Sequence, residues 1–169
     1  TVQAPWRANC FAVYGGGNHT IQDSLCSDTA NYPGILIGAE FSSHPFTGTT
    51  TIQRTTLNRA GGRFNGGNNG ALKVIALQTD LPGLSAKDLL IRESTYAGIQ
   101  FEGPFQILGA DLDNIQNSNA GTVGTLVTGN ARGSANAANL VVLDPAIAGL
   151  QNDAGSSWTF VRRSGNIGW

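Results

Sequence analysis

The fold is decided by Phe11-Ala12-Val13-Tyr14 and by Thr20-Ile21-Gln22-Asp23-Ser24-Leu25, two stretches that both recur along the chain. The first returns as Ile35-Leu36-Ile37, a step of 24 residues between the apolar positions. The second returns as Thr51-Ile52-Gln53-Arg54-Thr55-Thr56-Leu57, again Thr-Ile-Gln followed by a leucine. Each copy combines short alternating runs with polar turn residues, which is typical of β-strands. The chain therefore contains an internal repeat of strands.

The spacing of later apolar runs indicates which all-β architecture the repeat builds. Val74 to Ile99 is a step of 25 residues, and Gly98 to Gly124 is a step of 26. A sandwich made of hairpins shows turns every ~8–12 residues and no repeat of this length. Coils of about 25 residues with short strands stack as rungs in a parallel β-helix. We predict an all-β parallel β-helix of about six irregular rungs.

Alternation along a strand predicts which side chains of the rungs face the core. The residues predicted to point inward are Phe11, Val13, Ile21, Ile35, Ile37, Ile52, Ile99 and Phe101. Those predicted to point outward are Ala12, Tyr14, Leu36, Gln100 and Glu102. Helical periodicity is nearly absent, and the best helical candidate is the short stretch Pro145 to Leu150.

Length and composition favour one domain that covers residues 1–169. The Gly/Asn-rich segment 60–70 interrupts the period, and we predict a long loop there, with an interdomain linker as the alternative. Charged residues make up only 12% and the net charge is -1, which argues against nucleic acid as a partner. No apolar run reaches the ~20 residues of a membrane-spanning helix. The chain has no Met, so we expect a segment upstream of residue 1.

The two cysteines and two histidines show no metal-ligand spacing, so we expect neither a metal nor another cofactor. Cys10 and Cys26 allow one disulfide, and two free thiols are an equal alternative. In the rung arrangement Cys10 points outward and Cys26 inward, which disfavours the bond. His19 and His44 are predicted to be turn residues.

Several short motifs, taken in order, resemble glycoside hydrolase family 87, the bacterial mycodextranases and α-1,3-glucanases. The resemblance covers most of the chain and is weakest from about Asn119 to Ser157. The motifs that carry it are Ala8-Asn9-Cys10-Phe11-Ala12-Val13-Tyr14-Gly15-Gly16, Gly34-Ile35-Leu36-Ile37-Gly38, Pro45-Phe46-Thr47-Gly48-Thr49-Thr50-Thr51-Ile52, Ser94-Thr95-Tyr96-Ala97-Gly98-Ile99-Gln100-Phe101 and Trp158-Thr159-Phe160-Val161-Arg162-Arg163.

This resemblance implies a right-handed β-helix from the C-terminal part of a secreted enzyme that cuts an α-glucan polysaccharide with inversion. It also implies catalytic carboxylates, including an adjacent pair of Asp, on rungs upstream of the segment that begins at Ala8. No Asp-Asp pair occurs in the 169 residues. A β-helix cut at its upstream end exposes a rung of unpaired backbone groups, so we expect a partner on the Thr1 side, either the upstream polypeptide or a second copy stacked end to end. A non-catalytic structural or adhesive β-helix is the alternative.

Carboxylates inside the chain give weaker catalytic candidates. An inverting glycosidase needs an acid and a base whose carboxyls lie ~6.5–9.5 Å apart. Asp111 and Asp113 share one face of a predicted strand, although exposed surface pairs of this kind are far commoner than active sites. Glu40 and Glu102 end two strands of one predicted sheet, so we expect them in one column that contacts sugar.

Aromatic and amide side chains complete the predicted substrate-binding set. The C–H faces of a pyranose are apolar, so a sugar groove needs aromatic rings beside hydrogen-bonding groups. Tyr14, Tyr32 and Tyr96 each lie beside a candidate strand, and Gln100 is predicted to point outward between them. Trp6 is a further candidate, with an end-of-core plug as the equal alternative.

Overall fold

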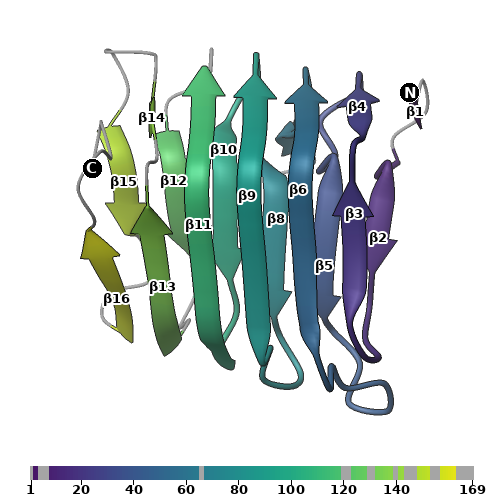
Figure 1. Cartoon of the computed structure of the whole chain (residues 1–169), viewed down its shortest axis with the longest axis vertical. Coiled ribbons are helices and arrows are strands. Elements are labelled where there is room, and N and C mark those ends of the chain that lie inside the picture. The colour runs from purple at the N-terminus through teal and green to yellow at the C-terminus, as the bar shows by residue number, and fades with distance from the viewer. Residues whose placement is uncertain are drawn as a thin grey trace.

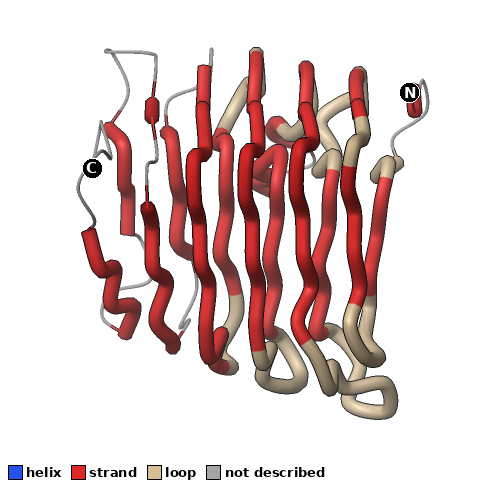
Figure 2. Tube along the Cα trace, in the orientation of Figure 1, coloured by secondary structure: helices blue, strands red, loops and turns tan. Residues whose placement is uncertain are grey.

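The computed structural model describes residues 2–3, 8–64, 67–118, 123–128, 132–138, 141–142, 148–152 and 157–162. Every regular element in this part is a β-strand, so it contains no helix that could cross a membrane (Figure 2). Trp6 and residues 143–147, which include the start of the short helical candidate, lie outside the described residues. Ala148–Asn152, the end of that candidate and two residues beyond it, forms a strand.

Two parallel sheets lie face to face, and the chain passes from one to the other in each rung (Figure 1). In Figure 1 the front sheet, here called sheet A, runs upward, and sheet B behind it runs downward. Sheet A contains β1 (Val2–Gln3), β3 (His19–Gln22), β4 (Leu25–Ser27), β6 (Thr49–Asn58), β9 (Gly83–Arg92), β11 (Gln106–Ser118), β13 (Arg132–Ala138), β14 (Val141–Val142) and β16 (Ser157–Arg162). Sheet B contains β2 (Phe11–Val13), β5 (Ile35–Ala39), β8 (Gly67–Ala76), β10 (Ala97–Glu102), β12 (Val123–Thr128) and β15 (Ala148–Asn152), with β7 (Gly62–Phe64) added at its side.

The strand register confirms the parallel β-helix and the repeat found in the sequence. Phe11 pairs with Ile35 in sheet B, and Ile21 pairs with Ile52 in sheet A. Ile35 continues to Leu72, which pairs with Ile99. Equivalent residues of successive rungs therefore stack, as a solenoid requires.

The core lies between the two sheets and contains the predicted inward residues. Six of them belong to the buried apolar cluster, while Phe11 and Val13 are partly buried and pack against it. Their partners across the rungs are mostly β-branched or leucine side chains, which fit the pleated surface of a sheet. The six predicted inward residues in the buried cluster are Ile21, Ile35, Ile37, Ile52, Ile99 and Phe101.

Sheet A bends once in each of four rungs, at a residue with positive φ. These residues are Asp23 (φ 52), Arg54 (φ 49), Asp88 (φ 53) and Asn114 (φ 52). The Arg54 guanidinium binds both carboxylate oxygens of Asp23, at 2.6 and 2.8 Å, and lowers the pKa of that carboxyl by hydrogen bonding. Asn114 Nδ2 donates to Asp88 Oδ1 at 2.6 Å. These exposed contacts align the bends, although solvent screening limits their contribution to stability.

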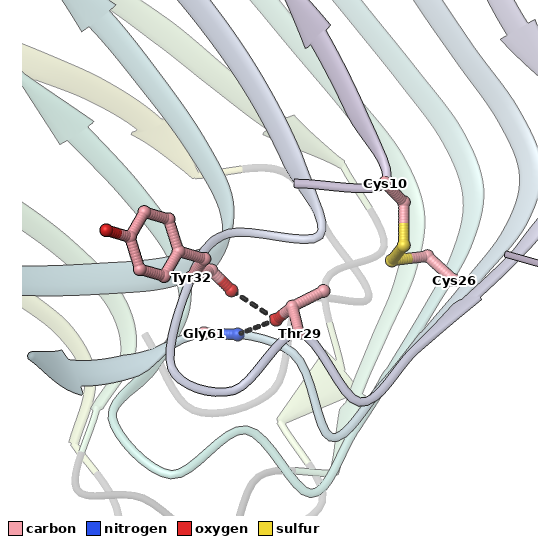
Figure 3. Close-up of a disulfide and its surroundings, with 5 residues drawn as sticks. All are labelled: Cys10, Cys26, Thr29, Tyr32 and Gly61. Atoms are coloured by element: carbon pink, nitrogen blue, oxygen red, sulfur yellow. Dashed lines mark hydrogen bonds between the residues drawn. A yellow bond between two sulfur atoms is a disulfide. The ribbon is translucent and has the colours of Figure 1, made fainter. Parts of the chain in front are cut away.

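A disulfide joins Cys10 to Cys26, with 5.9 Å between the two Cα atoms (Figure 3). The expectation from strand alternation was wrong, because Cys10 lies in a bend before β2, where alternation does not apply. The Cys10 amide donates to the Gly34 carbonyl, which holds that bend against the next rung. Cys26 is fully buried on β4, so the bond links the start of sheet B to sheet A.

Segment 60–70, predicted as a loop, contains a β-hairpin. β7 pairs antiparallel with the first residues of β8, so that Gly62 faces Asn69. The base of the hairpin is held by the buried Thr29 hydroxyl, which donates to the Tyr32 carbonyl and accepts the Gly61 amide at 3.3 Å (Figure 3). β8 then continues directly into sheet B, so the second half of the segment is part of a rung strand.

Candidate functional site

The outer face of sheet B gathers polar and aromatic side chains from four rungs. The register of β2, β5, β8 and β10 places Val13, Ile37, Val74 and Phe101 in one row. The residue after each of them forms the next row, on the outer face. That row reads Tyr14, Gly38, Ile75 and Glu102. Tyr14 and Glu102, predicted from the sequence, are therefore aligned across the sheet.

Glu40 joins this row although it lies two residues after Gly38, just beyond the end of β5. Glu40 directly follows β5 and Glu102 ends β10, two strands of sheet B, but Glu102 aligns with Gly38 and not with Glu40. A Cβ on Gly38 would lie 2.8 Å from Glu40 Oε1 and 3.1 Å from Tyr14 Cδ1. Because Gly38 has no side chain, Glu40 folds back over it, beside the Tyr14 ring.

Lys73 binds Glu102, at the end of the row away from Tyr14. Its ammonium is 2.9 Å from Glu102 Oε2 and also donates to Asn68 O and Asn69 Oδ1, both at 3.2 Å. The Lys73 side chain is only 13% exposed, so its charge needs these partners. The network fixes Glu102 as an acceptor and connects it to the β7–β8 hairpin.

Gln100, predicted as an outward sugar contact, is buried in the structure. Its side chain accepts the Gly70 amide at 2.9 Å and donates to Glu102 Oε2 at 3.2 Å. The residue is 1% exposed, so it positions Glu102 from beneath the surface. Alternation gave its direction correctly and could not reveal this burial, because the covering contacts come from another rung.

The electrostatic surroundings of the two carboxylates differ. Burial raises the pKa of Glu40, attraction to Lys73 opposes that rise, and repulsion from Glu102 adds to it. Burial also raises the pKa of the Tyr14 hydroxyl, and the charge of Glu40 contributes. The pKa of Glu40 therefore lies above that of an ordinary glutamate, because burial disfavours the charged form.

A hollow of about 440 Å³ opens beside Tyr14, at the end of the sheet B strands. Its lining comes from the connections that follow β2 and β5, namely Tyr14, Gly15, Gly16, Phe41, His44 and Pro45. The Tyr14 and Phe41 rings meet edge to face, with centroids 5.6 Å apart. Such a volume is within the range of small-molecule sites, which combine apolar walls with a few polar groups.

Tyr32 and Tyr96, also predicted to contact sugar, lie at the other end of the sheet B strands. Tyr32 precedes β5 and packs against Phe64 with ring centroids 5.7 Å apart. Tyr96 precedes β10, is 6% exposed and has the Arg63 guanidinium 4.7 Å from its ring centroid. Both rings contact the β7 hairpin strand, and the structure does not bring them together with Tyr14.

Asp111 and Asp113 lie on the other sheet. Both belong to β11 in sheet A, in register with Ser85 and Lys87. Lys87 Nζ is 3.6 Å from Asp113 Oδ2, an exposed ion pair. The two aspartates share an outer face, as the spacing predicts, but that face is on the opposite side of the core from Glu40 and Glu102.

A second hollow of about 590 Å³ lies where sheet A connects back to sheet B. Arg59 lines it and binds both carboxylate oxygens of Asp28, at 2.5 and 2.8 Å, while Glu93 lies 3.8 Å away. Asp28, Arg59 and Glu93 come from three successive rungs, so their ion pairs form a ladder along the axis. Within the described ranges no cluster of three or more His, Cys, Asp or Glu side chains could hold a metal ion.

Sequence reasoning missed Lys73 and Phe41. Lys73 shows a usable signal, because it is a charged residue within the strongly apolar run that forms β8. Phe41 shows none, because it lies in an irregular connection where no period assigns a direction.

The chain matches the family model for the alpha-1,3-glucanase catalytic domain D2 over residues 1–166. No curated protein matches it. Among solved structures it is similar to the catalytic domain of a glycoside hydrolase family 87 α-1,3-glucanase with an aspartate-to-alanine substitution, in complex with nigerose. That similarity has a TM-score of 0.80 and 25% identity. A second structure, without that substitution and also with nigerose, gives 0.79 and 24%.

The alignment with the first of these structures covers 95% of this chain and 34% of the solved chain. The chain thus spans about a third of the length of the catalytic domains that it resembles. The family model covers nearly all of the chain, and the stacked parallel strands agree with the fold of those domains. The chain belongs to the alpha-1,3-glucanase catalytic domain D2 family, and its parallel β-helix is that of glycoside hydrolase family 87 catalytic domains.

Proposed function

We propose that this chain is the part of an α-1,3-glucan hydrolase that supplies scaffold and substrate-groove subsites. The observation that carries the proposal is the row of Tyr14, Glu40 and Glu102 on the outer face of sheet B, in which Lys73 holds Glu102. A row across several rungs runs along the β-helix axis, so it offers successive contacts to an extended chain. The structural or adhesive alternative is not favoured, because the matching family is a catalytic domain.

The chemistry available on this face supports binding. Glu102 receives hydrogen bonds from Lys73 and Gln100, and a carboxylate has further acceptor sites for sugar hydroxyls. The adjacent aspartates implied by the family resemblance are missing from the 169 residues. We therefore assign the catalytic carboxylates to a part of the enzyme outside this chain, and binding to the face described here.

We expect the 169-residue chain to bind α-1,3-linked gluco-oligosaccharides and to release no reducing sugar from α-1,3-glucan. Glu40→Gln should weaken binding about tenfold, because a hydrogen bond to a neutral amide contributes about 0.5–1.5 kcal/mol and one to a charged carboxylate about 1.5–3 kcal/mol. Isothermal titration measures the binding, and a reducing-sugar assay measures the turnover.

The matched control is Asp113→Asn, which alters a carboxylate on sheet A and should leave binding unchanged. Equal affinities of the unaltered chain and both variants would place the sugar away from sheet B. Turnover that Glu40→Gln abolishes would instead assign catalysis to this face.

We also propose that a further rung packs against β2 and β3, supplied by an upstream polypeptide or by a second copy of this chain. Within the described residues, β2 pairs only with β5 and β3 only with β6, so one edge of each strand has no partner strand there. Phe11 and Val13 beside this edge are only partly buried. Open strand edges favour pairing with another chain. In size-exclusion chromatography the chain should elute as species larger than 17.6 kDa, and a single monomer peak would refute this proposal.

Secretion is the third element of the proposal. The Cys10–Cys26 disulfide supports it, since such bonds persist in oxidising compartments and are rare in the cytosol. A polymeric α-glucan substrate supports it as well, because an enzyme that degrades it acts where the polymer is.

A further inference from the structure

Four exposed apolar side chains follow the ends of four successive sheet B strands. Tyr14 comes after β2, Phe41 after β5, Leu77 after β8 and Phe105 after β10. Their exposed fractions are 39%, 50%, 43% and 40%. Leu77 N donates to Ala39 O and Phe105 N to Ala76 O, so the connections lie against one another from rung to rung. At ~4.8 Å per rung these four residues, here called the apolar stripe, extend roughly 15 Å along the axis.

The hollow at one end of the stripe is held in shape by backbone contacts. Gly16 N donates to Pro45 O, and Thr47 N donates to Gly16 O at 2.7 Å. Gly15 has φ 146, and a Cβ there would lie 2.0 Å from His44 O. Only glycine allows the two connections to approach this closely. The walls of the hollow are therefore fixed before a ligand arrives, which lowers the entropic cost of binding.

The two rings form a corner and not a stack. Tyr14 and Phe41 meet at 67°, edge to face, and both rings line the hollow. Both rings keep a large exposed fraction, so neither is buried in the core and both can contact a ligand. Glu40 lies beside the Tyr14 ring, over Gly38, and places a carboxyl group next to this corner.

We propose that this hollow binds one glucose ring of an α-glucan in the corner between Tyr14 and Phe41, stacked on one ring and bounded by the other, and that the chain continues over Leu77 and Phe105. The proposal rests on the proposed function and goes further, since it assigns a ring-stacking subsite and a direction along the apolar stripe. An apolar pyranose face matches the aromatic walls, and its hydroxyls reach Glu40. The related catalytic domains were solved with nigerose and with tetrasaccharides, ligands of this class.

The volume of the hollow favours a sugar over a protein partner. About 440 Å³ suits one small ligand, whereas a stable protein interface needs roughly 800 Å² from each side.

Binding of an α-1,3-linked glucose tetrasaccharide to the full chain tests the proposal. Tyr14→Ala and Phe41→Ala should each lower the affinity about tenfold, the order expected for loss of an aromatic contact. Tyr14→Phe should retain the affinity within about twofold, because the stacking face remains. In the unaltered chain, NMR amide signals of Gly15 and Gly16 should shift on titration, a readout that needs no substitution.

Leu25→Ala is the matched control, since Leu25 is also 39% exposed but lies on β4 of sheet A. Circular dichroism establishes that each variant keeps its strand content. If the unaltered chain binds and the Tyr14→Ala and Phe41→Ala variants bind equally well, the subsite is refuted while the proposed function stands. If the unaltered chain binds no α-glucan, the proposed function fails and the subsite with it.

Discussion

Replacing Phe101 by alanine should lower the free energy of unfolding by about 3–5 kcal/mol, the range for removing a large buried aromatic side chain. Phe101 is fully buried and in register with Val74 on one side and Val127 on the other. Its ring therefore fills the space between the sheets in the middle of the rung stack. Because stability in a solenoid comes from contacts between neighbouring rungs, the cavity weakens both interfaces of β10.

Urea unfolding followed by far-UV circular dichroism measures this effect. Phe105→Ala provides the control, since Phe105 lies only four positions further along the chain but is 40% exposed. Its free energy of unfolding should change by no more than about 0.5 kcal/mol, as for ordinary surface positions. A loss below about 1 kcal/mol for Phe101→Ala would mean that the rungs do not pack on one another at this position.

Loss of the disulfide should cost about 3 kcal/mol. Cys10 and Cys26 are 16 residues apart, and closing a loop of this length restricts the unfolded chain by about that amount. The bond joins the bend before β2 to the buried middle residue of β4, across the first rung (Figure 3). The double variant Cys10→Ala/Cys26→Ala should therefore unfold at lower urea concentration than the unaltered chain.

A reducing agent gives the matched comparison without a substitution. Dithiothreitol should lower the stability of the unaltered chain to that of the double variant and leave the double variant unchanged. Alkylation and mass spectrometry on protein recovered from the culture medium should find no free thiol at Cys10 or Cys26. Free thiols in that protein would contradict both the bond and the proposed secretion.

The fold follows largely from local sequence. Strand alternation has a period of two residues, so the runs at Phe11, Ile35 and Ile99 assign core and surface wherever a strand is regular. The recurrence of Thr-Ile-Gln predicted the pairing of Ile21 with Ile52 because equivalent residues of stacked rungs must fit one another. Strand direction and rung pairing can therefore be predicted from the repeat alone, without knowing any other contact between distant residues.

The candidate site was only partly predictable. Tyr14 and Glu102 fall in one row because their strands are in register, and the sequence assigns both to the outer face. Glu40 reaches that row by folding over Gly38, which depends on the missing side chain of a neighbour and not on its own register. Gln100 points as predicted but is covered, and Phe41 enters the site from an irregular connection.

Amino-acid sequence by itself therefore determined the all-β class, the stacked rungs and the core side chains, because each depends on periodicity along the chain. Tertiary structure alone decided the Cys10–Cys26 bond and the separation of Asp111 and Asp113 from the two glutamates. It also decided the corner formed by Tyr14 and Phe41. These features join residues from different rungs or from bends, where the backbone leaves the strand conformation and alternation no longer fixes the direction of a side chain.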